Sequence, residues 1–205
     1  MTALDEEAWD IFGGLHRLLL RLAGRVPDDL LTHARTMLGT GDLAYLPDLL
    51  TGSLAELGVT LVPRDAELLR RVPEALGAGA YPPAGLEQVG LTEETPATTH
   101  RFAPGGPADL TDDLLVDALT EREGVLAIRR ALRADPGEPR RVYLVEAAPG
   151  VPAWELTLDG QRELTEMDDK APQVEVFWSG EDLPDYHRKA LARAALLWPE
   201  ESARE

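Results

Sequence analysis

Apolar residues recur at helical spacing through the first third of the chain. The longest run includes Leu4, Ile11, Leu15 and Leu22, with acidic residues at its start and arginines near its end. This pattern predicts an amphipathic helix over residues 4–25. Proline and glycine positions mark the ends of three shorter helices and leave room for one short strand. The shorter predicted elements are helices at 27–38, 47–57 and 64–72, the last stopped by Pro73, and a strand at 59–62.

Residues 77–107 interrupt the helical pattern. Six glycines and five prolines fall within these 31 residues, which is too many for a helix or a strand, so a long loop or linker is predicted. Some larger side chains in this segment are expected to hold it against the folded body: Tyr81, Leu86, Val89 and Phe102.

The second half of the chain mixes helical and strand-like patterns. Thr111 and the two aspartates after it predict the start of a helix. Two apolar runs on either side of a Pro-Gly turn predict a β-hairpin of 125–132 with 141–148. Residues 152–167 carry both a hairpin signal and a helical pattern, and the helix is favoured because a crossover is needed before the next strand. The remaining predicted elements are a strand at 173–178 and a helix at 184–198.

The order helix, strand, strand, helix, strand, helix resembles the C-terminal domain of the enhanced serine sensitivity proteins. Many α+β domains share this order, and no residue motif assigns the chain to that family. The predicted fold class is α+β, with an N-terminal helical layer followed by a small antiparallel or mixed sheet covered by helices. The predicted organisation is a helical subdomain at 1–76, a loop or linker at 77–110, an α+β subdomain at 111–198 and a tail at 199–205.

The composition of the chain limits the cellular compartments and the classes of partner that are expected. The chain has no cysteine, which excludes disulfides, thiolate metal sites and cysteine nucleophiles. The acidic N-terminus lacks the basic region of a secretory signal and no apolar run could span a bilayer, so a cytoplasmic protein is expected, with no membrane association. The formal net charge of −17 is spread along the chain, and no basic stripe is present to neutralise nucleic acid phosphates. A basic protein partner would suit this charge, although a generally acidic proteome explains it more simply.

One stretch contains candidate catalytic chemistry. His187 lies in the predicted last helix, and Ser179 follows the predicted strand at 173–178. A serine nucleophile and a histidine base on consecutive elements would suit a hydrolase-like enzyme. However, His187 falls in the middle of the apolar face of its helix, and Ser179 is not part of a G-x-S-x-G elbow. A buried structural histidine is therefore the favoured interpretation, and hydrolysis is the alternative.

No cofactor or metal is expected from the sequence. The four histidines, His16, His33, His100 and His187, show no metal-binding spacing along one helix, and only the fold can bring them together. The Gly-Ala-Gly at 77–79 follows a helix instead of a strand and leads into two prolines, so it lacks the context of a phosphate-binding loop.

The remaining hypothesis is a non-enzymatic intracellular protein that binds another protein, as an adaptor, regulator or inhibitor. Its positive support is an acidic surface and a loop long enough for docking. Apolar and aromatic side chains anchor many protein interfaces. The candidates for partner contact are Trp9, Leu20, Tyr81, Phe102 and Leu196.

Overall fold

The computed structural model describes residues 5–77, 81–134 and 139–199. The chain forms two compact units, residues 1–96 and 97–205. The first unit is helical, and the second contains a five-stranded mixed sheet with helices. This arrangement confirms the predicted α+β class with the helical layer first. The division between the units falls within the segment predicted as a loop or linker.

The first unit is built from the helices α1 (Glu6–Leu22), α2 (Asp28–Thr40), α3 (Leu46–Leu57) and α4 (Pro63–Ala75). Helix α1 packs against α2 and α4, and α3 also contacts both of these helices. Asp5 caps α1 by accepting a hydrogen bond from the N–H of Ala8, and Gly58 ends α3 in the left-handed conformation that the sequence predicts there. The buried leucines of all four helices form the core of this unit.

Two predictions for the first unit are wrong. Pro73 was expected to stop the fourth helix, but it lies inside α4, which continues to Ala75. The missing N–H of a proline removes one intrahelical hydrogen bond, and this loss is tolerated close to a helix end. The strand expected at 59–62 is reduced to one isolated bridge between Leu61 and Leu91.

The Gly/Pro-rich segment is anchored on α3 through the backbone of Ala84. The Thr51 hydroxyl donates a hydrogen bond to the Ala84 carbonyl at 2.6 Å, and the Ala84 N–H donates to Asp48 Oδ1 at 2.7 Å. The short 3₁₀ helix η1 (Leu86–Gln88) follows, and its leucine is buried as expected. Tyr81 was also expected to hold this segment, but its side chain is 77% exposed, so that expectation is wrong.

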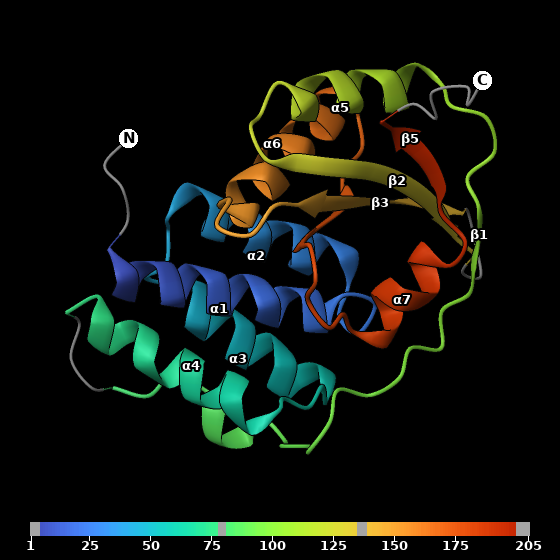
Figure 1. Cartoon of the computed structure of the whole chain (residues 1–205). Coiled ribbons are helices and arrows are strands. Elements are labelled where there is room, and N and C mark those ends of the chain that lie inside the picture. Colours follow the sequence, from blue (N-terminus) through green and yellow to red (C-terminus); the bar gives the residue numbers. More distant parts are fainter. Residues whose placement is uncertain (1–4, 78–80, 135–138, 200–205) are drawn as a thin grey trace. The chain divides into compact units, whose positions relative to one another are not determined.

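The second unit contains β1 (Phe102–Pro104), α5 (Leu110–Thr120), β2 (Val125–Arg133), β3 (Arg140–Ala147), α6 (Ala153–Glu166), β4 (Gln173–Trp178), α7 (Asp185–Leu191) and β5 (Ala195–Trp198). Strands β2 and β3 form the predicted antiparallel hairpin, and β4 pairs with β3 in parallel. The parallel pairing requires a crossover, and α6 supplies it, which confirms the helix predicted at 152–167. Helices α5 and α6 cover one face of the sheet, and α7 lies on the other (Figure 1).

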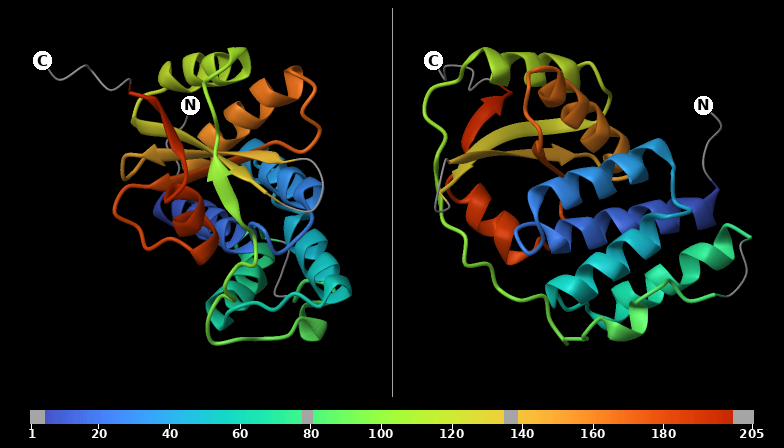
Figure 2. Two further views of the ribbon diagram at one scale, coloured as in Figure 1. Left: turned by 90° about the vertical axis from the view of Figure 1, so that its right-hand side faces the viewer. Right: turned by 180° about the vertical axis from the view of Figure 1, so that it is seen from behind.

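Strands β1 and β5 share one edge of β2 (Figure 2). Pro104 of β1 pairs with Ala131, and Ala195 of β5 pairs with the next residue, Arg130. Both strands run antiparallel to β2, so β5 continues the line of β1. Two segments from opposite ends of the unit therefore act as one discontinuous strand.

The prediction of a single helix over 184–198 is wrong beyond Leu191, where α7 ends. The apolar residues after it recur at helical spacing, but they occupy the free edge of β2, where strand pairing satisfies backbone groups that would otherwise have no partner. The start of α5 is also corrected, because Asp109 and not Thr111 caps the helix. Within the described ranges, no helix has the length and apolarity needed to cross a membrane.

Candidate functional site

His187 is fully buried on α7 and faces a carboxylate on β4. Its Nε2 atom lies 2.9 Å from Oε2 of Glu175, and both side chains are 0% exposed. An ionised Glu175 accepts a hydrogen bond only from a protonated Nε2, so this contact selects the tautomer of the ring. The Nδ1 atom of His187 is buried without a hydrogen-bond partner. The predicted burial of His187 is confirmed, and Glu175 is a neighbour that sequence spacing did not indicate.

Tyr186, the residue before His187, is the centre of an aromatic cluster. Tyr186 makes edge contacts with His187, with Phe102 of β1 and with His100, at ring-centroid distances of 5.3, 5.1 and 5.9 Å. Its hydroxyl accepts a hydrogen bond from Arg133 Nη1 at 3.3 Å. This cluster joins α7 to the segment around β1.

Asp185 also holds that segment, through backbone groups of Thr98. Its Oδ2 accepts a hydrogen bond from the Thr98 N–H at 3.0 Å, and Lys189 Nζ donates to the Thr98 carbonyl at 2.9 Å. The hydrogen bond from Lys189 lowers the pKa of the Asp185 carboxyl below its usual value. Asp185 and Lys189 on α7 thus fix the segment that leads into β1.

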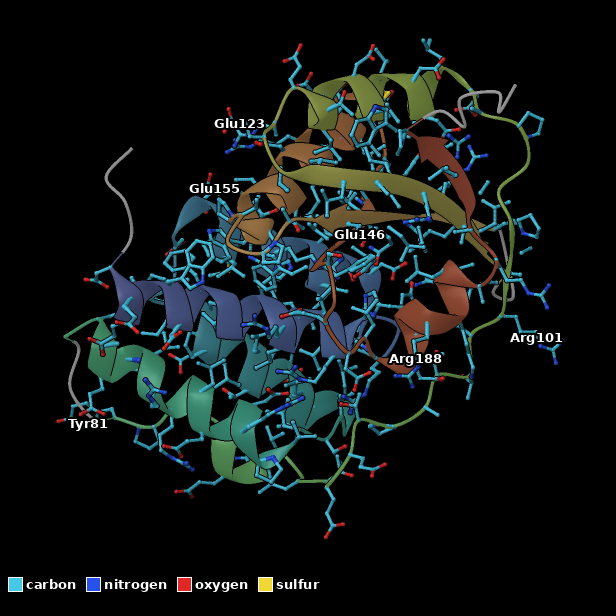
Figure 3. All side chains as sticks on the ribbon, viewed as in Figure 1. Tyr81, Arg101, Glu123, Glu146, Glu155 and Arg188 are labelled. Atoms are coloured by element: carbon cyan, nitrogen blue, oxygen red, sulfur yellow. The ribbon has the colours of Figure 1, made fainter. Side chains whose placement is uncertain are left out.

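Ser179 and His187 are not hydrogen bonded to each other in the structure. The Ser179 hydroxyl donates to Glu146 Oε1 at 2.8 Å, and Glu146 also lies 3.4 Å from Arg129 Nη1. Figure 3 labels Glu146 on β3. Ser179 is thus hydrogen bonded to Glu146, whereas His187 contacts a different carboxylate, that of Glu175.

The four histidines are divided between the two units. His100 and His187 both contact Tyr186. His16 is buried on α1 and His33 is exposed on α2, both in the first unit. The described residues contain no group of His, Cys, Asp or Glu side chains suited to a metal ion.

The residues predicted to contact a partner have different environments. Tyr81 is 77% exposed and Leu196 is 39% exposed, whereas Leu20 is buried at 3%. Trp9 and Phe102 are half-buried. Leu196 was expected within the helix predicted at 184–198, but it lies on β5. Tyr81 and Leu196 are therefore the two with the most surface available.

A buried ionic network lies on the opposite face of the sheet from His187. Arg130 on β2 donates from Nη1 to Asp112 Oδ2 and from Nη2 to the backbone carbonyls of residues 105–107. The side chains of Arg130 and Asp112 are both 1% exposed. The Tyr143 hydroxyl donates to Asp112 Oδ1 at 2.8 Å. Asp112 also accepts the N–H of Asp109, which closes the capping box of α5.

The network extends to the surface through Arg141. This side chain forms a two-point contact with Asp109, at 2.9 and 2.5 Å, and lies 3.6 Å from Asp112. The hydrogen bond from Arg141 lowers the pKa of the Asp109 carboxyl. Burial raises the pKa of the Tyr143 hydroxyl well above its usual value. The first turn of α5 is thus fixed to β2 and β3 by charge.

A surface groove of about 570 Å³ lies between α5 and β5, beside this network. Asp112, Asp113 and Asp117 line it from α5, with Trp198 on the β5 side. Asp112 is neutralised by Arg130, whereas Asp113 and Asp117 are exposed and have no cationic partner among the described residues. Like charges at positions i and i+4 of a helix destabilise it by a few tenths of a kcal/mol. The groove therefore presents two uncompensated carboxylates near an indole ring.

Two exposed leucines adjoin this pair of carboxylates. Leu110 is 71% exposed and Leu114 is 38% exposed. At about 100° per residue, Leu110, Leu114, Asp113 and Asp117 fall within about 100° of one another around α5. We call these four residues the α5 face. It combines apolar and acidic side chains on one helix surface.

One feature of the sequence could have predicted the buried ionic network. Two adjacent arginines, Arg129 and Arg130, interrupt the apolar residues in the middle of β2. Neighbouring strand residues point to opposite faces, so one of the two had to point towards a covering helix and needed a carboxylate there. The acidic groove could not be predicted in this way, because one of its sides is β5, which the sequence analysis assigned to a helix.

Comparison with known proteins gave no match. No protein-family model, no curated protein and no solved structure matches the chain significantly. The contacts described above are therefore the basis for a functional proposal.

Proposed function

We propose that this protein is a non-enzymatic cytoplasmic binding protein whose α5 face and adjoining groove hold a basic segment of a partner protein. The observation that carries the proposal is the groove of about 570 Å³ with Asp113 and Asp117 on one side and Trp198 on the other. The acidic composition and the lack of cysteine are compatible with this role.

The groove suits a lysine or arginine side chain. Such a cation would remove the repulsion between Asp113 and Asp117. A cation near the face of a tryptophan ring gains about 0.5–2 kcal/mol, depending on how far it is desolvated. Leu110 and Leu114 would add apolar contact beside the charged pair. Acidic and apolar side chains on one helix surface thus favour a basic partner that also carries apolar residues.

A salt-dependent pull-down tests the proposal. The wild-type chain and the variant Asp113→Asn/Asp117→Asn are immobilised and challenged with lysate of the source cells at low salt, then eluted with rising salt. The matched control is Glu121→Gln/Glu123→Gln, which removes two carboxylates just beyond α5 and outside the groove; Figure 3 labels Glu123.

We expect one stoichiometric partner on the wild type and on the control, released below about 0.5 M salt because screening weakens exposed charge pairs. The variant in the groove should retain much less of it. Equal retention by all three proteins would contradict the groove as the binding site. The absence of any partner at low salt would contradict the binding function itself.

The hydrolase-like alternative has less support from the geometry. Its proposed nucleophile, Ser179, is hydrogen bonded to Glu146, and its proposed base, His187, is buried against Glu175. A catalytic base needs to lie within hydrogen-bond reach of the proton it removes. Loss of turnover in a well-folded His187→Ala variant would favour this alternative.

A further inference from the structure

A second groove, of about 380 Å³, lies in the first unit between α1 and α4. Its charged lining differs in sign from the chain as a whole, which has a net charge of −17. The arginines that line it come from both helices, and two carboxylates lie with them: Arg17, Arg21, Arg64 and Arg71, with Asp65 and Glu67. The charged side chains of this groove therefore have a net charge of about +2 at neutral pH. We call it the arginine groove.

The close packing of α1 and α4 forms the floor of the arginine groove. A side chain at Gly14 would meet Leu68, because a Cβ there would lie 2.9 Å from Leu68 Cδ2. The small residue lets the two helices approach, and arginines of both helices line the groove between them. Gly14, Arg17 and Arg21 recur every three or four residues, so they share one face of α1.

Arg21 is held in place by a buried carboxylate. Its Nε donates to Asp65 Oδ2 at 2.8 Å and its Nη2 donates to Asp65 Oδ1, and the Asp65 side chain is 3% exposed. The Nη1 group of Arg21 makes no hydrogen bond in the part of the chain that the structure describes. A two-point contact fixes the guanidinium plane, so this remaining donor group is preorganised at the groove.

Arg64 and Arg71 are exposed and have no ion-pair partner among the described residues, although carboxylates greatly outnumber basic residues in the chain. Arg64 lies in the first turn of α4. A positive charge there is unfavourable because the N-terminus of a helix already carries partial positive charge. The neighbouring Arg70, by contrast, is paired with Glu67 at 2.7 Å and does not line the groove.

We infer that the arginine groove binds a small phosphate-bearing ligand. Guanidinium groups bind phosphate oxygens through paired hydrogen bonds, and a tetrahedral phosphate can accept them from both helices at once. The net charge of the lining matches a phosphate dianion. The groove volume falls within the range of small-molecule sites and leaves room beside Leu68 for the group that carries the phosphate. This site lies in the first unit and does not depend on the α5 face.

Isothermal titration calorimetry with inorganic pyrophosphate tests this inference. We expect one site per chain with a dissociation constant below about 1 mM at low salt. Arg64→Gln and Arg71→Gln should each weaken binding by about tenfold, because each removes a charge-assisted contact. Arg162→Gln is the control: it removes one exposed positive charge from α6 of the second unit, a residue that does not line the groove, and should change the affinity by less than about twofold.

The three substituted arginines are exposed, so circular dichroism should show that every variant keeps the wild-type helix content. Citrate serves as a polycarboxylate probe and should bind at least about tenfold more weakly than pyrophosphate. Equal binding of citrate would overturn the preference for phosphate. Equal losses in all three arginine variants, or no saturable binding of pyrophosphate, would overturn the site.

Discussion

Asp112→Asn is expected to destabilise the second unit strongly. The substitution removes the negative charge opposite Arg130, while both side chains are 1% exposed. Removing one member of a buried ion pair costs about 3–5 kcal/mol, because the other charge is left uncompensated. The carbonyls of residues 105–107 still accept hydrogen bonds from Arg130. They do not neutralise its charge, so we expect a loss of about 3 kcal/mol or more in the free energy of unfolding.

The same network supplies a control. Asp109 contacts Arg141 at the surface, and its side chain is 48% exposed. Asp109→Asn removes that ion pair but keeps a residue that caps helices well. The expected loss is below about 1 kcal/mol, since exposed ion pairs contribute little. The contrast between Asp112 and Asp109 isolates the effect of burial on one charge in one helix turn.

Urea unfolding followed by tryptophan fluorescence measures both variants. Trp154 and Trp178 are buried in the second unit and their rings contact each other, so the signal reports mainly on that unit. A double variant, Asp112→Leu/Arg130→Met, should be more stable than Asp112→Asn, because an apolar pair replaces the unpaired charge. A loss below about 1 kcal/mol for Asp112→Asn, or a double variant less stable than Asp112→Asn, would refute the reasoning.

Three further predictions concern single positions in the second unit. The raised pKa of Tyr143 means that this hydroxyl contributes its full stabilisation below about pH 10. Above about pH 10 the Tyr143 hydroxyl ionises in the unfolded state but not in the folded state. The free energy of unfolding should therefore fall by about 1.4 kcal/mol per pH unit. Tyr143→Phe should remove that part of the alkaline slope in urea titrations from pH 9 to 11.5, and an unchanged slope would assign it to other groups. His187→Ala leaves the carboxylate of Glu175 buried without its imidazole partner, and should lower the free energy of unfolding by about 2–5 kcal/mol in the same assay; wild-type stability would show that the pair is not structural. Gly160→Ala places a Cβ 3.0 Å from Val174 Cγ1. The cost of overpacking, about 1–3 kcal/mol, exceeds the gain in helix propensity of about 0.5–1 kcal/mol, so the variant should unfold at a lower temperature than the wild type. A higher unfolding temperature would refute the overpacking.

Much of the fold was predictable because its signals are local. Apolar residues at helical spacing and glycine caps indicated the helices of the first unit. The hairpin of β2 and β3 followed from two apolar runs around one turn, and α6 followed from the need for a crossover before β4. The final helix was wrong because residues 195–198 form a strand only by pairing with β2, more than 60 residues earlier in the chain. Helical spacing in the sequence cannot reveal such a long-range pairing.

The candidate chemistry was less predictable, since it depends on partners far apart in the sequence. The burial of His187 followed from its place on an apolar helix face. Glu175 could not be identified as its partner, because β4 reads as an alternating strand with no sign of which residues meet α7. Glu146 could not be identified as the partner of Ser179 either, because the two residues are neighbours only through the parallel pairing of β3 and β4. The arginine groove likewise required the packing of α1 on α4.

The discontinuous strand formed by β1 and β5 has a consequence for the order in which the sheet can be completed during synthesis. Its first segment, β1, precedes β2 in the chain, whereas its second, β5, is synthesised after every other strand. Until β5 is made, the backbone of residues 128–130 has no partner on that edge of β2. An open strand edge can pair with a strand of another chain. The nascent protein is therefore open to mispairing at this edge of β2 until β5 emerges from the ribosome.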